Sequence, residues 1–329
     1  MRAIVIDAPG GPEVLRELSL PAPTPGPRQI RIRVIAAGVN RADLLQRRGV
    51  YPAPPGVPAE IPGLEYAGLV DEVGPGVTQW EPGDKVMGIV GGGSYAEFVV
   101  VDEREALPIP PGLSFVEAGA IPEAFLTAHD ALFTLLGLEG GDSLLIHAVG
   151  SGVGLAALQL ARQAGARVIG TSRSPWKLDG AGEYGLEYGI EVDDPADLPA
   201  EILRFTEGEG VDTVLDLVGG AYMPANLEAL APRGRVALVG LVAGRRAELD
   251  LGLLLNRRAT LIGTVMRSRS LEEKIAVTEA FREGALASFE GGGIRPVVDR
   301  VFPFDEVAAA HEYVEDDQNL GKVVLTWEP

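Results

Sequence analysis

A glycine-rich segment, Gly150-Ser151-Gly152-Val153-Gly154, follows a short apolar run and precedes a helical pattern. Where a strand ends in such a turn and a helix begins, backbone N–H groups and the positive end of the helix can face a pyrophosphate, which side chains would keep at a distance. The spacing departs from G-x-G-x-x-G because Leu155 stands at the last glycine position. The segment predicts a dinucleotide-phosphate site, and a glycine-rich turn without a ligand is the alternative.

The end of the next expected strand bears on the choice between NAD and NADP. NAD enzymes place an acidic residue about 20 residues after the turn, where it binds the ribose 2′-hydroxyl. This chain has Ser172, Arg173 and Lys177 in that region instead, and their hydroxyl and cationic groups suit a 2′-phosphate. The pattern favours NADP(H). The alternative is that Arg173 and Lys177 are solvated charges on a loop and a helix start.

Residues able to bind metal are scarce. The chain has no Cys, which removes thiolate ligands and disulfides. The stretch from His311 to Glu315 begins like H-E-x-x-H but ends in Glu. We interpret His311 as an ordinary helix residue, and His129 and His147 as packing or hydrogen-bonding residues. We therefore expect no metal site.

Length and charge narrow the class of protein. The 329 residues include 43 Gly and 25 Pro with 46% apolar residues, which predicts a turn-rich globular chain of two domains. The net charge of -19 disfavours nucleic acid and anionic membranes as partners. The start of the chain is unlike a secretory signal, and glycines and polar residues interrupt the longest uncharged run, Leu144–Ala161. We expect a cytoplasmic protein that acts on a small molecule.

The expected secondary structure follows two different patterns, one in the first third of the chain and one after it. Short strands between Pro and Gly turns in residues 1–115 favour a β-rich domain, at Ala3–Ile6, Gln29–Ala36, Ala67–Val73, Lys85–Ile89 and Tyr95–Val101. After Pro122, strands alternating with helices favour a doubly wound parallel sheet, with strands at Leu144–His147, Arg167–Ser172, Ile190–Val192, Asp212–Val218, Arg235–Val239 and Thr260–Val265. A tail with helices at Leu271–Gly284 and after Phe304, and a strand at Lys322–Leu325, could finish either domain.

Short motifs run from one end of the chain to the other. They are Asn40-Arg41-Ala42-Asp43-Leu44, Gln46-Arg47-Arg48-Gly49, Tyr51, Pro62-Gly63-Leu64-Glu65, Gly91-Gly92-Gly93, Ile121-Pro122-Glu123-Ala124, Leu126-Thr127-Ala128, Ser151-Gly152-Val153-Gly154, Arg267-Ser268-Arg269 and Asn319-Leu320-Gly321-Lys322. With these motifs the whole chain resembles the quinone oxidoreductase, or zeta-crystallin-like, branch of the medium-chain dehydrogenase/reductase superfamily, and within it the tumour-suppressor-inducible subtype.

The resemblance implies an α/β fold of two domains. A GroES-like β-rich catalytic domain would comprise residues 1–121 and 266–329, and a Rossmann dinucleotide-binding domain residues 122–265, with NADPH in the cleft. Members of the branch commonly form homodimers or homotetramers through the edge strand of the Rossmann sheet, which here would lie near Thr260–Val265.

The resemblance also implies roles for single residues. Asn40 and Tyr51 would line the substrate pocket, with the Tyr51 hydroxyl or a water as proton or hydrogen-bond donor, and Thr127 would lie near the nicotinamide. Further contacts with the cofactor are implied for Gly240, Leu241, Asn319 and Lys322. Local alternatives stay open, because Asn40 and Asp43 could simply cap the following helix and Tyr51 could pack in a turn. Val192 stands where many relatives carry a Tyr against the 2′-phosphate, so NAD also stays open.

The same resemblance points to chemistry without zinc. It places Asn40, Leu64 and Glu123 where zinc-dependent members of the superfamily hold their catalytic metal, and catalytic zinc needs three protein ligands. Oxidising a simple alcohol would then lack a Lewis acid, whereas a quinone or an enone spreads the incoming charge over its own π system. The prediction is an NADPH-dependent quinone oxidoreductase. The alternatives are an enone or enoyl-thioester reductase and a noncatalytic, zeta-crystallin-like structural or RNA-binding protein.

Overall fold

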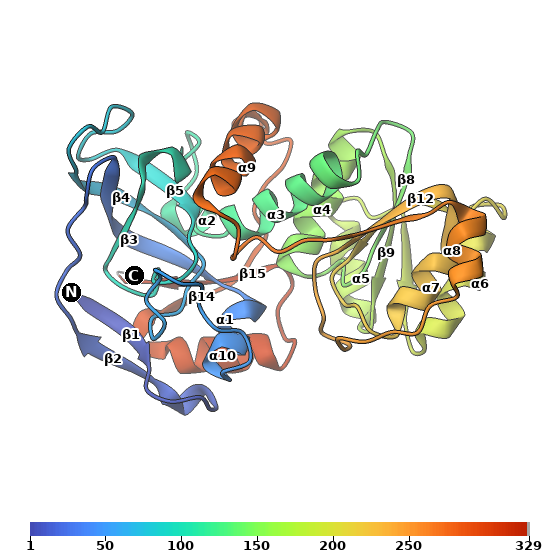
Figure 1. The fold of residues 1–329 in the computed structure, drawn as a ribbon, viewed down its shortest axis with the longest axis horizontal. Coiled ribbons are helices and arrows are strands. Elements are labelled where there is room, and N and C mark those ends of the chain that lie inside the picture. The colour runs from blue at the N-terminus through green and yellow to red at the C-terminus, as the bar shows by residue number, and fades with distance from the viewer. Residues whose placement is uncertain (328–329) are drawn as a thin grey trace. The chain divides into compact units, whose positions relative to one another are not determined.

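The computed structural model describes residues 1–327 and has two compact units (Figure 1). Unit 1 consists of Met1–Leu126 and Met266–Pro329, and unit 2 of Thr127–Val265. Glu328 and Pro329, at the end of the predicted 266–329 segment, lie outside the described residues. Each unit has its own sheet and its own apolar core.

Unit 1 is built on a sheet centred on the long strand β3. The sheet has the order β14-β15-β3-β4-β5-β7, β6 also pairs with β3, and β1 and β2 form a separate pair. The strands are β1 (Arg2–Ile6), β2 (Leu15–Ser19), β3 (Gln29–Val39), β4 (Glu65–Val73), β5 (Lys85–Ile89), β6 (Phe98–Asp102), β7 (Ala106–Pro108), β14 (Val298–Pro303) and β15 (Lys322–Thr326). In β3, Ile30, Ile32 and Val34 are buried and alternate with less buried residues, as expected for a sheet with one face on the core.

The tail of the chain completes unit 1. Strand β15 pairs antiparallel with β3, with Val323 opposite Val39, and the end of the chain groups with unit 1. The helices are α1 (Arg41–Arg47), α2 (Phe115–Ala118), α9 (Leu271–Gly284) and α10 (Val307–Glu315), and Pro122–Leu126 form a π-helical turn. Helix α9 has the predicted bounds because Ser270 and Glu273 form a capping box at its start.

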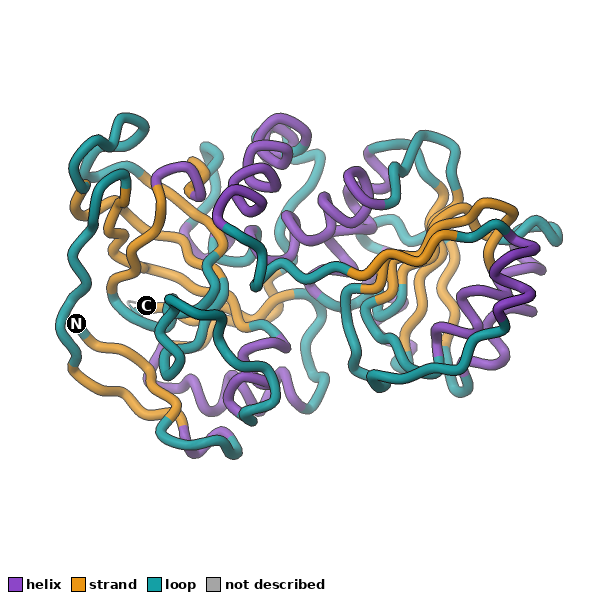
Figure 2. The backbone as a smooth tube through the Cα atoms, in the orientation of Figure 1, coloured by secondary structure: helices purple, strands orange, loops and turns teal. Residues whose placement is uncertain are grey.

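Unit 2 is a doubly wound parallel sheet with the strand order β10-β9-β8-β11-β12-β13. Its strands are β8 (Ser143–Ile146), β9 (Arg167–Ser172), β10 (Tyr188–Glu191), β11 (Val211–Asp216), β12 (Leu230–Leu238) and β13 (Thr260–Gly263). Its helices are α3 (Thr127–His129), α4 (Gly152–Gln163), α5 (Pro175–Gly182), α6 (Leu198–Phe205), α7 (Tyr222–Ala229) and α8 (Leu251–Arg257), and Asp130–Leu135 form a second π-helical turn. Figure 2 shows the strands of this sheet side by side between helices. The predicted fold class is confirmed: the order reverses between β8 and β11, as in a Rossmann sheet.

Three strands of unit 1, namely β2, β7 and β14, were not foreseen. In β2 only Leu15 is buried and the next four residues are exposed, so the strand lacks an alternating apolar pattern. In β14 only Phe302 is buried. These strands are held by pairing with their neighbours rather than by a periodicity that the sequence displays.

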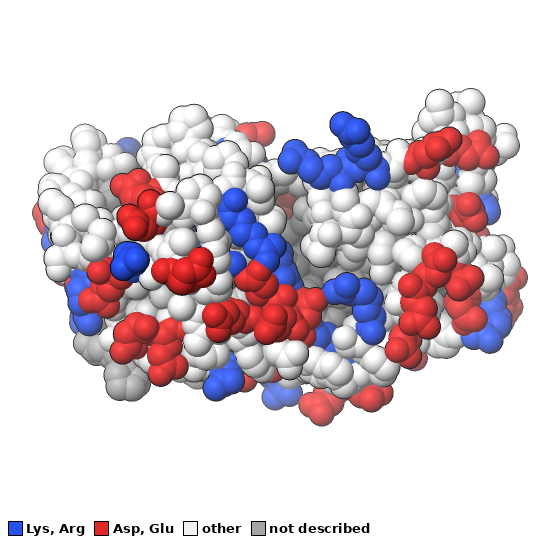
Figure 3. Space-filling model, turned by 90° about the horizontal axis from the view of Figure 1, so that it is seen from below, with Lys and Arg blue, Asp and Glu red and all other residues white. Residues whose placement is uncertain are grey.

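None of the helices in residues 1–327 has the length and apolar character that a membrane crossing requires. Acidic and basic side chains are interspersed over the face seen in Figure 3.

Candidate active site

A buried ionic cluster joins β3, β4 and β15 in unit 1. The Lys322 ammonium donates to Glu65 Oε1 at 2.5 Å, to Asn40 Oδ1 at 2.6 Å and to the carbonyl of Val39 at 3.2 Å. Asn40 Nδ2 donates to the same Glu65 oxygen at 2.9 Å. Because Lys322 and Glu65 are both buried, the charge of each is compensated by the other and the ammonium uses all its hydrogens inside the unit.

Asp43 fixes the turn from which Asn40 reaches this cluster. Its carboxylate accepts hydrogen bonds from the backbone N–H of Asn40 at 2.8 Å and of Gly63 at 3.0 Å. Burial raises the pKa of Asp43 to about 6, although the two N–H groups favour the charged form. Asn40 is the N-cap of α1 and forms a capping box with Asp43, which is the local role considered as an alternative for these two residues. The side-chain amide of Asn40 also contacts Lys322 and Glu65.

Tyr51 lies against Arg267. The guanidinium donates to the carbonyl of Gly91 at 2.7 Å, to the carbonyl of Tyr51 at 3.1 Å and to Gln46 Oε1 at 2.6 Å, and its carbon lies 5.1 Å from the centre of the Tyr51 ring. Burial raises the pKa of the Tyr51 phenol, Arg267 lowers it and the nearby Glu123 raises it. Arg267 is therefore fixed in place, and it orients the ring of Tyr51, for which the resemblance implied a place in the substrate pocket.

Glu123 belongs to the π-helical turn beside the ionic cluster. Its backbone N–H donates to Glu65 Oε2 at 2.8 Å. Burial and then the charge of Glu65 raise the pKa of the Glu123 carboxyl to about 8, and Lys322 opposes the shift. The turn thus places a second acidic side chain close to Glu65 and Tyr51.

His311 of α10 is buried and lies close to polar groups from other parts of unit 1. Its Nδ1 lies 3.4 Å from Arg47 NH1 and its Nε2 lies 3.4 Å from the Tyr95 hydroxyl. Burial lowers the pKa of His311 to about 3, so the ring is neutral. Glu315, at the end of the metal-like stretch, pairs with Arg47 at 2.6 Å. The segment from His311 to Glu315 therefore contacts Arg47 and Tyr95 of the same unit, and the side chain of His311 is fully buried.

In unit 2 the glycine-rich turn joins β8 to α4. Ser151 is the N-cap of α4, and its hydroxyl accepts from the N–H of Gly154 at 3.1 Å. A Cβ on Gly154 would lie 2.6 Å from the carbonyl oxygen of Val149, so the close approach of helix and turn requires glycine there. The N–H groups of Gly152 and Val153 begin the helix and have no acceptor within it, an arrangement that suits an anion.

A second buried polar group spans the carboxyl ends of β8, β9 and β11. His147 Nδ1 lies 2.9 Å from Thr171 Oγ1, His147 Nε2 lies 2.6 Å from Asn226 Oδ1, and Asn226 Nδ2 donates to Asp216 at 2.9 Å. Since Asn226 uses its NH2 on Asp216, its oxygen must accept from His147 Nε2–H, and Nδ1 accepts from the Thr171 hydroxyl. Asp216 also accepts from two backbone N–H groups of residues 218 and 219 at 2.8 Å each. This neutral imidazole links the strand ends where the sheet order reverses, the place where such sheets bind ligands.

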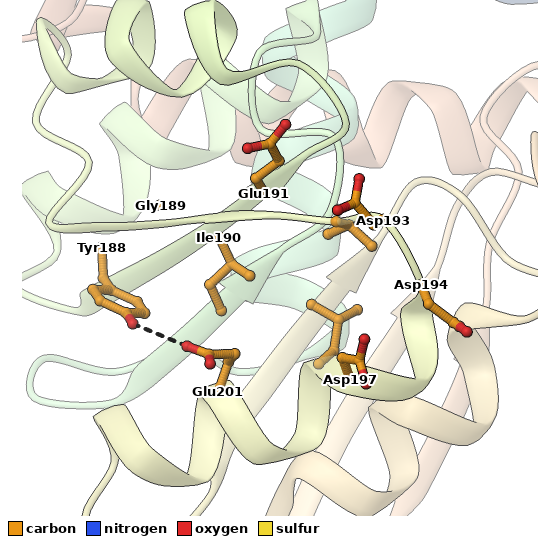
Figure 4. Close-up of a pocket in the computed structure, with 10 residues that line it drawn as sticks. Tyr188, Gly189, Ile190, Glu191, Asp193, Asp194, Asp197 and Glu201 are labelled. Carbon is orange, nitrogen blue, oxygen red and sulfur yellow. Dashed lines mark hydrogen bonds between the residues drawn. The ribbon is translucent and has the colours of Figure 1, made fainter.

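The end of β9 carries basic and hydroxyl groups beside an acidic groove. The Ser172 hydroxyl accepts from the N–H of Ser174 at 3.0 Å. Its partner in the parallel register is Glu191 of β10. Figure 4 shows Glu191 on the opposite side of β10 from Tyr188, near a groove of about 310 Å³ between β10 and α6. The acidic residues lining that groove are Glu191, Asp193, Asp194, Asp197 and Glu201.

The remaining residues for which the resemblance implied a contact with the cofactor are divided between the two units. Gly240 of unit 2 is closely packed, since a Cβ there would lie 2.1 Å from the carbonyl oxygen of residue 217, and Leu241 beside it is 47% exposed. The buried Thr127 hydroxyl has no hydrogen-bond partner among the described residues. Asn319 of unit 1 donates to the carbonyl of residue 321 at 2.7 Å. Within unit 1 the structure joins Asn40 directly to Lys322.

Sequence reasoning gave no role to Glu65, Asp216 or Asn226, and it assigned Lys322 to the cofactor. Glu65 and Lys322 each begin an apolar strand, and a charged residue next to buried apolar residues signals a buried partner of opposite charge. The sequence does not show which two strands are neighbours, so this signal could not name the pair. Asp216 and Asn226 are ten positions apart and carry no motif, and only the fold brings them to His147.

The chain resembles known proteins over nearly its whole length. Residues 26–111 match the family model "Alcohol dehydrogenase GroES-like domain" and residues 152–282 match "Zinc-binding dehydrogenase". A quinone oxidoreductase of Pseudomonas aeruginosa is 33% identical over 325 residues, covering 98% of this chain and 99% of that protein. The chain belongs to the medium-chain dehydrogenase/reductase superfamily.

Solved structures of this superfamily agree with that assignment. One described as an NAD-dependent alcohol dehydrogenase has a TM-score of 0.88 at 37% identity, with 99% of both chains covered. A mycobacterial protein in complex with NADPH has a TM-score of 0.87 at 30% identity, with 99% of both chains covered. The CurK enoyl reductase has a TM-score of 0.87 at 29% identity, covering 99% of this chain and 98% of that one. The protein is therefore an oxidoreductase of this superfamily, and a nicotinamide cofactor follows from the family.

One of the matching family models is named for zinc, and the side chains in unit 1 do not fit that metal. Of the three positions that the resemblance assigned to zinc ligands, Leu64 is apolar and buried. The Asn40 oxygen accepts from the Lys322 ammonium at 2.6 Å, so a fixed positive charge stands where a cation would have to approach. Glu123 is the one residue of the three whose side chain is an ordinary zinc ligand, and catalytic zinc needs three protein ligands. We derive no chemical step through zinc.

Proposed function

We propose that the protein is a zinc-independent, NADPH-dependent quinone oxidoreductase. The observation that carries this proposal is the buried cluster of Lys322, Asn40 and Glu65. In this cluster the Lys322 ammonium donates a hydrogen bond to Asn40, the side chain that stands at a zinc-ligand position by resemblance. A site of this kind offers hydrogen-bond donors and fixed charge but no Lewis acid. Quinones and similar conjugated carbonyls suit such a site, because their own π system spreads the incoming charge.

Unit 1 supplies the groups for the acceptor. Tyr51 carries a hydroxyl whose pKa is raised by burial, so it stays a neutral hydrogen-bond donor at neutral pH. Arg267 holds the ring of Tyr51 through a 5.1 Å contact, and Asp43 holds Asn40 through its backbone. In this proposal Tyr51 and Asn40 orient the acceptor, and the buried ionic cluster keeps Asn40 in one conformation.

Unit 2 supplies the site for the nucleotide. The first N–H groups of α4, after Gly150 and Ser151, would bind the pyrophosphate. Ser172, Arg173 and Lys177 would bind the 2′-phosphate, and Glu191 beside Ser172 would weaken that preference without abolishing it. When bound, the reduced nicotinamide supplies a hydride to the acceptor. The Thr127 hydroxyl, which lacks a partner among the described residues, is the group we assign to the carboxamide end.

A panel of acceptors tests this function. We expect stopped-flow oxidation of NADPH by 1,4-benzoquinone and 9,10-phenanthrenequinone to exceed the uncatalysed rate, and simple aldehydes to be poor acceptors. Rates with both quinones that equal the background would overturn the proposal.

Reduction of an enone or enoyl thioester is the second candidate, favoured by the similarity to an enoyl reductase structure. The same donors would serve, because hydride addition to an enone also places negative charge on a carbonyl oxygen. Faster turnover of alkenals or enoyl-CoA esters than of any quinone would promote this candidate over the first.

We further propose that a second copy pairs along β13. This strand lies at the edge of the unit 2 sheet, and Leu261 in it and Leu251 and Leu255 of the neighbouring α8 are 36%, 66% and 75% exposed. An exposed apolar edge of this kind is typical of an interface. Sedimentation should show a dimer or tetramer, with Leu255→Glu shifting it toward monomer, and a monomeric wild type would contradict the proposal.

A further inference from the structure

Tyr51 stands on a loop of unit 1 that forms neither helix nor strand. The loop lies between the end of α1 at Arg47 and the start of β4 at Glu65. Four of the seven residues from position 52 to position 58 are prolines, which lack the backbone N–H that hydrogen bonds within the loop would use. The position of Tyr51 therefore has to be set by contacts with other segments of the unit.

Arg267 makes several of these contacts at once. Its guanidinium donates from Nε to the carbonyl of Gly91 at 2.7 Å, from Nη1 to the carbonyl of Tyr51 at 3.1 Å and from Nη2 to Gln46 Oε1 at 2.6 Å. Gln46 in turn donates from Nε2 to the carbonyl of Ala59 at 2.8 Å. One side chain thus joins the start of the loop directly, and its end through Gln46, to the segment that follows β5.

The middle of the loop packs on the run Gly91-Gly92-Gly93. A Cβ on Gly91 would lie 2.9 Å from Val57 Cγ2 and 3.2 Å from Pro54 Cγ, and a Cβ on Gly92 would lie 2.8 Å from Val57 Cγ1. Residues without a side chain allow this close approach, so the packing of the loop explains the glycines at these two positions. The resemblance rested on this run and on Arg267-Ser268-Arg269 without implying a role for either, and the structure brings the two motifs together at the loop.

Arg267 is a buried cation held by neutral groups. It is 5% exposed, and its acceptors are two backbone carbonyls and one amide oxygen. No ion pair joins it to a carboxylate within residues 1–327. The planar guanidinium directs its donors in fixed directions, whereas a lysine ammonium is a point charge on a flexible stem. Lysine at this position would keep the charge and lose the three directed hydrogen bonds.

We propose that Arg267 is a positioning residue for quinone reduction, which fastens the loop to the Gly91 carbonyl and so sets the place and orientation of Tyr51. This inference rests on the function proposed above, in which the Tyr51 hydroxyl donates a hydrogen bond to the acceptor. Arg267 acts on the loop through its bond to the Tyr51 carbonyl and on the ring through the 5.1 Å contact. Its effect on turnover is therefore exerted through Tyr51.

A double-mutant cycle tests whether Arg267 acts through Tyr51. We expect Arg267→Lys and Tyr51→Phe each to lower kcat/KM for 1,4-benzoquinone about tenfold, mainly in kcat, because the hydrogen bond strengthens as negative charge develops on the acceptor oxygen. The double variant should be no slower than Tyr51→Phe alone, whereas two independent effects would multiply to about 100-fold. Arg33→Lys is the matched control, since Arg33 is an exposed arginine of β3, and it should leave kcat/KM unchanged.

Hydrogen exchange gives a readout that needs neither nucleotide nor turnover. In Arg267→Lys the amides of residues 53–61 should exchange about tenfold faster than in the wild type, while those of α10 keep their wild-type rates. Gln46→Met removes the link to Ala59 and leaves the bonds of Arg267 to Gly91 and Tyr51 in place. It should give a smaller increase in the same segment, and it serves as the test if Arg267→Lys does not fold.

The two measurements separate this inference from the proposed function. Wild-type exchange rates in the loop of the variants, or losses that multiply in an active enzyme, would overturn the role of Arg267 and leave the proposed function standing. A wild type that reduces neither quinones nor enones would overturn the proposed function and this inference with it.

Discussion

The two units bury polar networks of different character. Unit 1 buries full charges, since Lys322 and Glu65 are in contact at 2.5 Å and Asn40 bridges them. Unit 2 joins its strand ends through the neutral ring of His147 and the amide of Asn226, with one carboxylate, Asp216, at the end of the chain of hydrogen bonds. The charged network lies in the unit to which we assign the acceptor, and the neutral network joins strand ends at the place where the order of the parallel sheet reverses.

This difference has an energetic consequence. Removing one partner of a buried ion pair leaves an unpaired charge in a medium of low dielectric constant, whereas removing a neutral partner leaves only an unmade hydrogen bond. The unit 1 network should therefore be the more sensitive of the two, and the experiments below compare them in order of expected effect.

Lys322→Met should have the largest effect. It leaves Glu65 buried without its cation, and we expect the free energy of unfolding of unit 1 to fall by about 3–5 kcal/mol in calorimetry or urea titration. Adding Glu65→Gln should restore part of the loss. As a control, Lys85→Met removes an exposed lysine 5.6 Å from the ring of Phe115 and should cost less than about 1 kcal/mol. Equal losses in the two single variants would remove the distinction between the networks.

Asn226→Ala should have the next largest effect. It leaves His147 Nε2 and one oxygen of Asp216 each short of a hydrogen bond, and we expect unit 2 to lose about 2–3 kcal/mol. NADPH should also bind more weakly in fluorescence titration, because the strand ends beside the glycine turn are less firmly held. Asn256→Ala on the exposed side of α8 is the control and should leave both quantities nearly unchanged. A stable variant with normal affinity would show that the neutral network is dispensable.

Acid pH should act on unit 1 through His311. Burial depresses its pKa in the folded state to about 3, below the ordinary value of 6.5, so the buried neutral ring is compatible with folding above pH 6.5, and stability is lost as the pH falls toward 3. Between pH 6.5 and 5 the loss should be about 2 kcal/mol. Unfolding measured against pH should show a shallower slope in His311→Gln than in the wild type. Identical slopes would mean that the buried ring contributes nothing to acid sensitivity.

Substitutions at the end of β9 should have the smallest effect, on the preference for NADPH over NADH. Arg173 and Glu191 should change this preference in opposite directions. Arg173→Ala should lower the ratio of kcat/KM for NADPH over NADH about tenfold, because a cation near the 2′-phosphate is lost. Glu191→Gln should raise the same ratio severalfold, because a carboxylate beside Ser172 is neutralised. If neither variant changes the ratio, the 2′-phosphate does not bind at this strand end.

Sequence patterns predicted most of unit 2 and the long elements of unit 1. The parallel sheet follows from apolar runs such as Leu144–His147 alternating with helical segments. Helix α9 has the bounds expected from the sequence, and the structure shows a capping box at its start. The edge strand β14 was not predicted, because four of its six residues are exposed and its position depends on pairing with β15.

The polar networks could be predicted only in part. The resemblance implied a place for Asn40 in the substrate pocket and a cofactor contact for Lys322. It did not imply the contact between Lys322 and Glu65, which are 257 residues apart in the chain. Contacts over such a separation depend on the strand order, which periodicity does not contain. The raised pKa of Glu123 likewise depends on burial and on a neighbour from another strand.

We propose that unit 1 uses the buried ammonium of Lys322 at the place where the resemblance puts a zinc site. The most direct measurement is the turnover of NADPH with 1,4-benzoquinone by protein whose metal content has been determined by elemental analysis before and after treatment with a strong chelator. We predict far less than stoichiometric zinc and an unchanged rate after chelation. A rate that falls with chelation and returns on adding zinc would contradict the account.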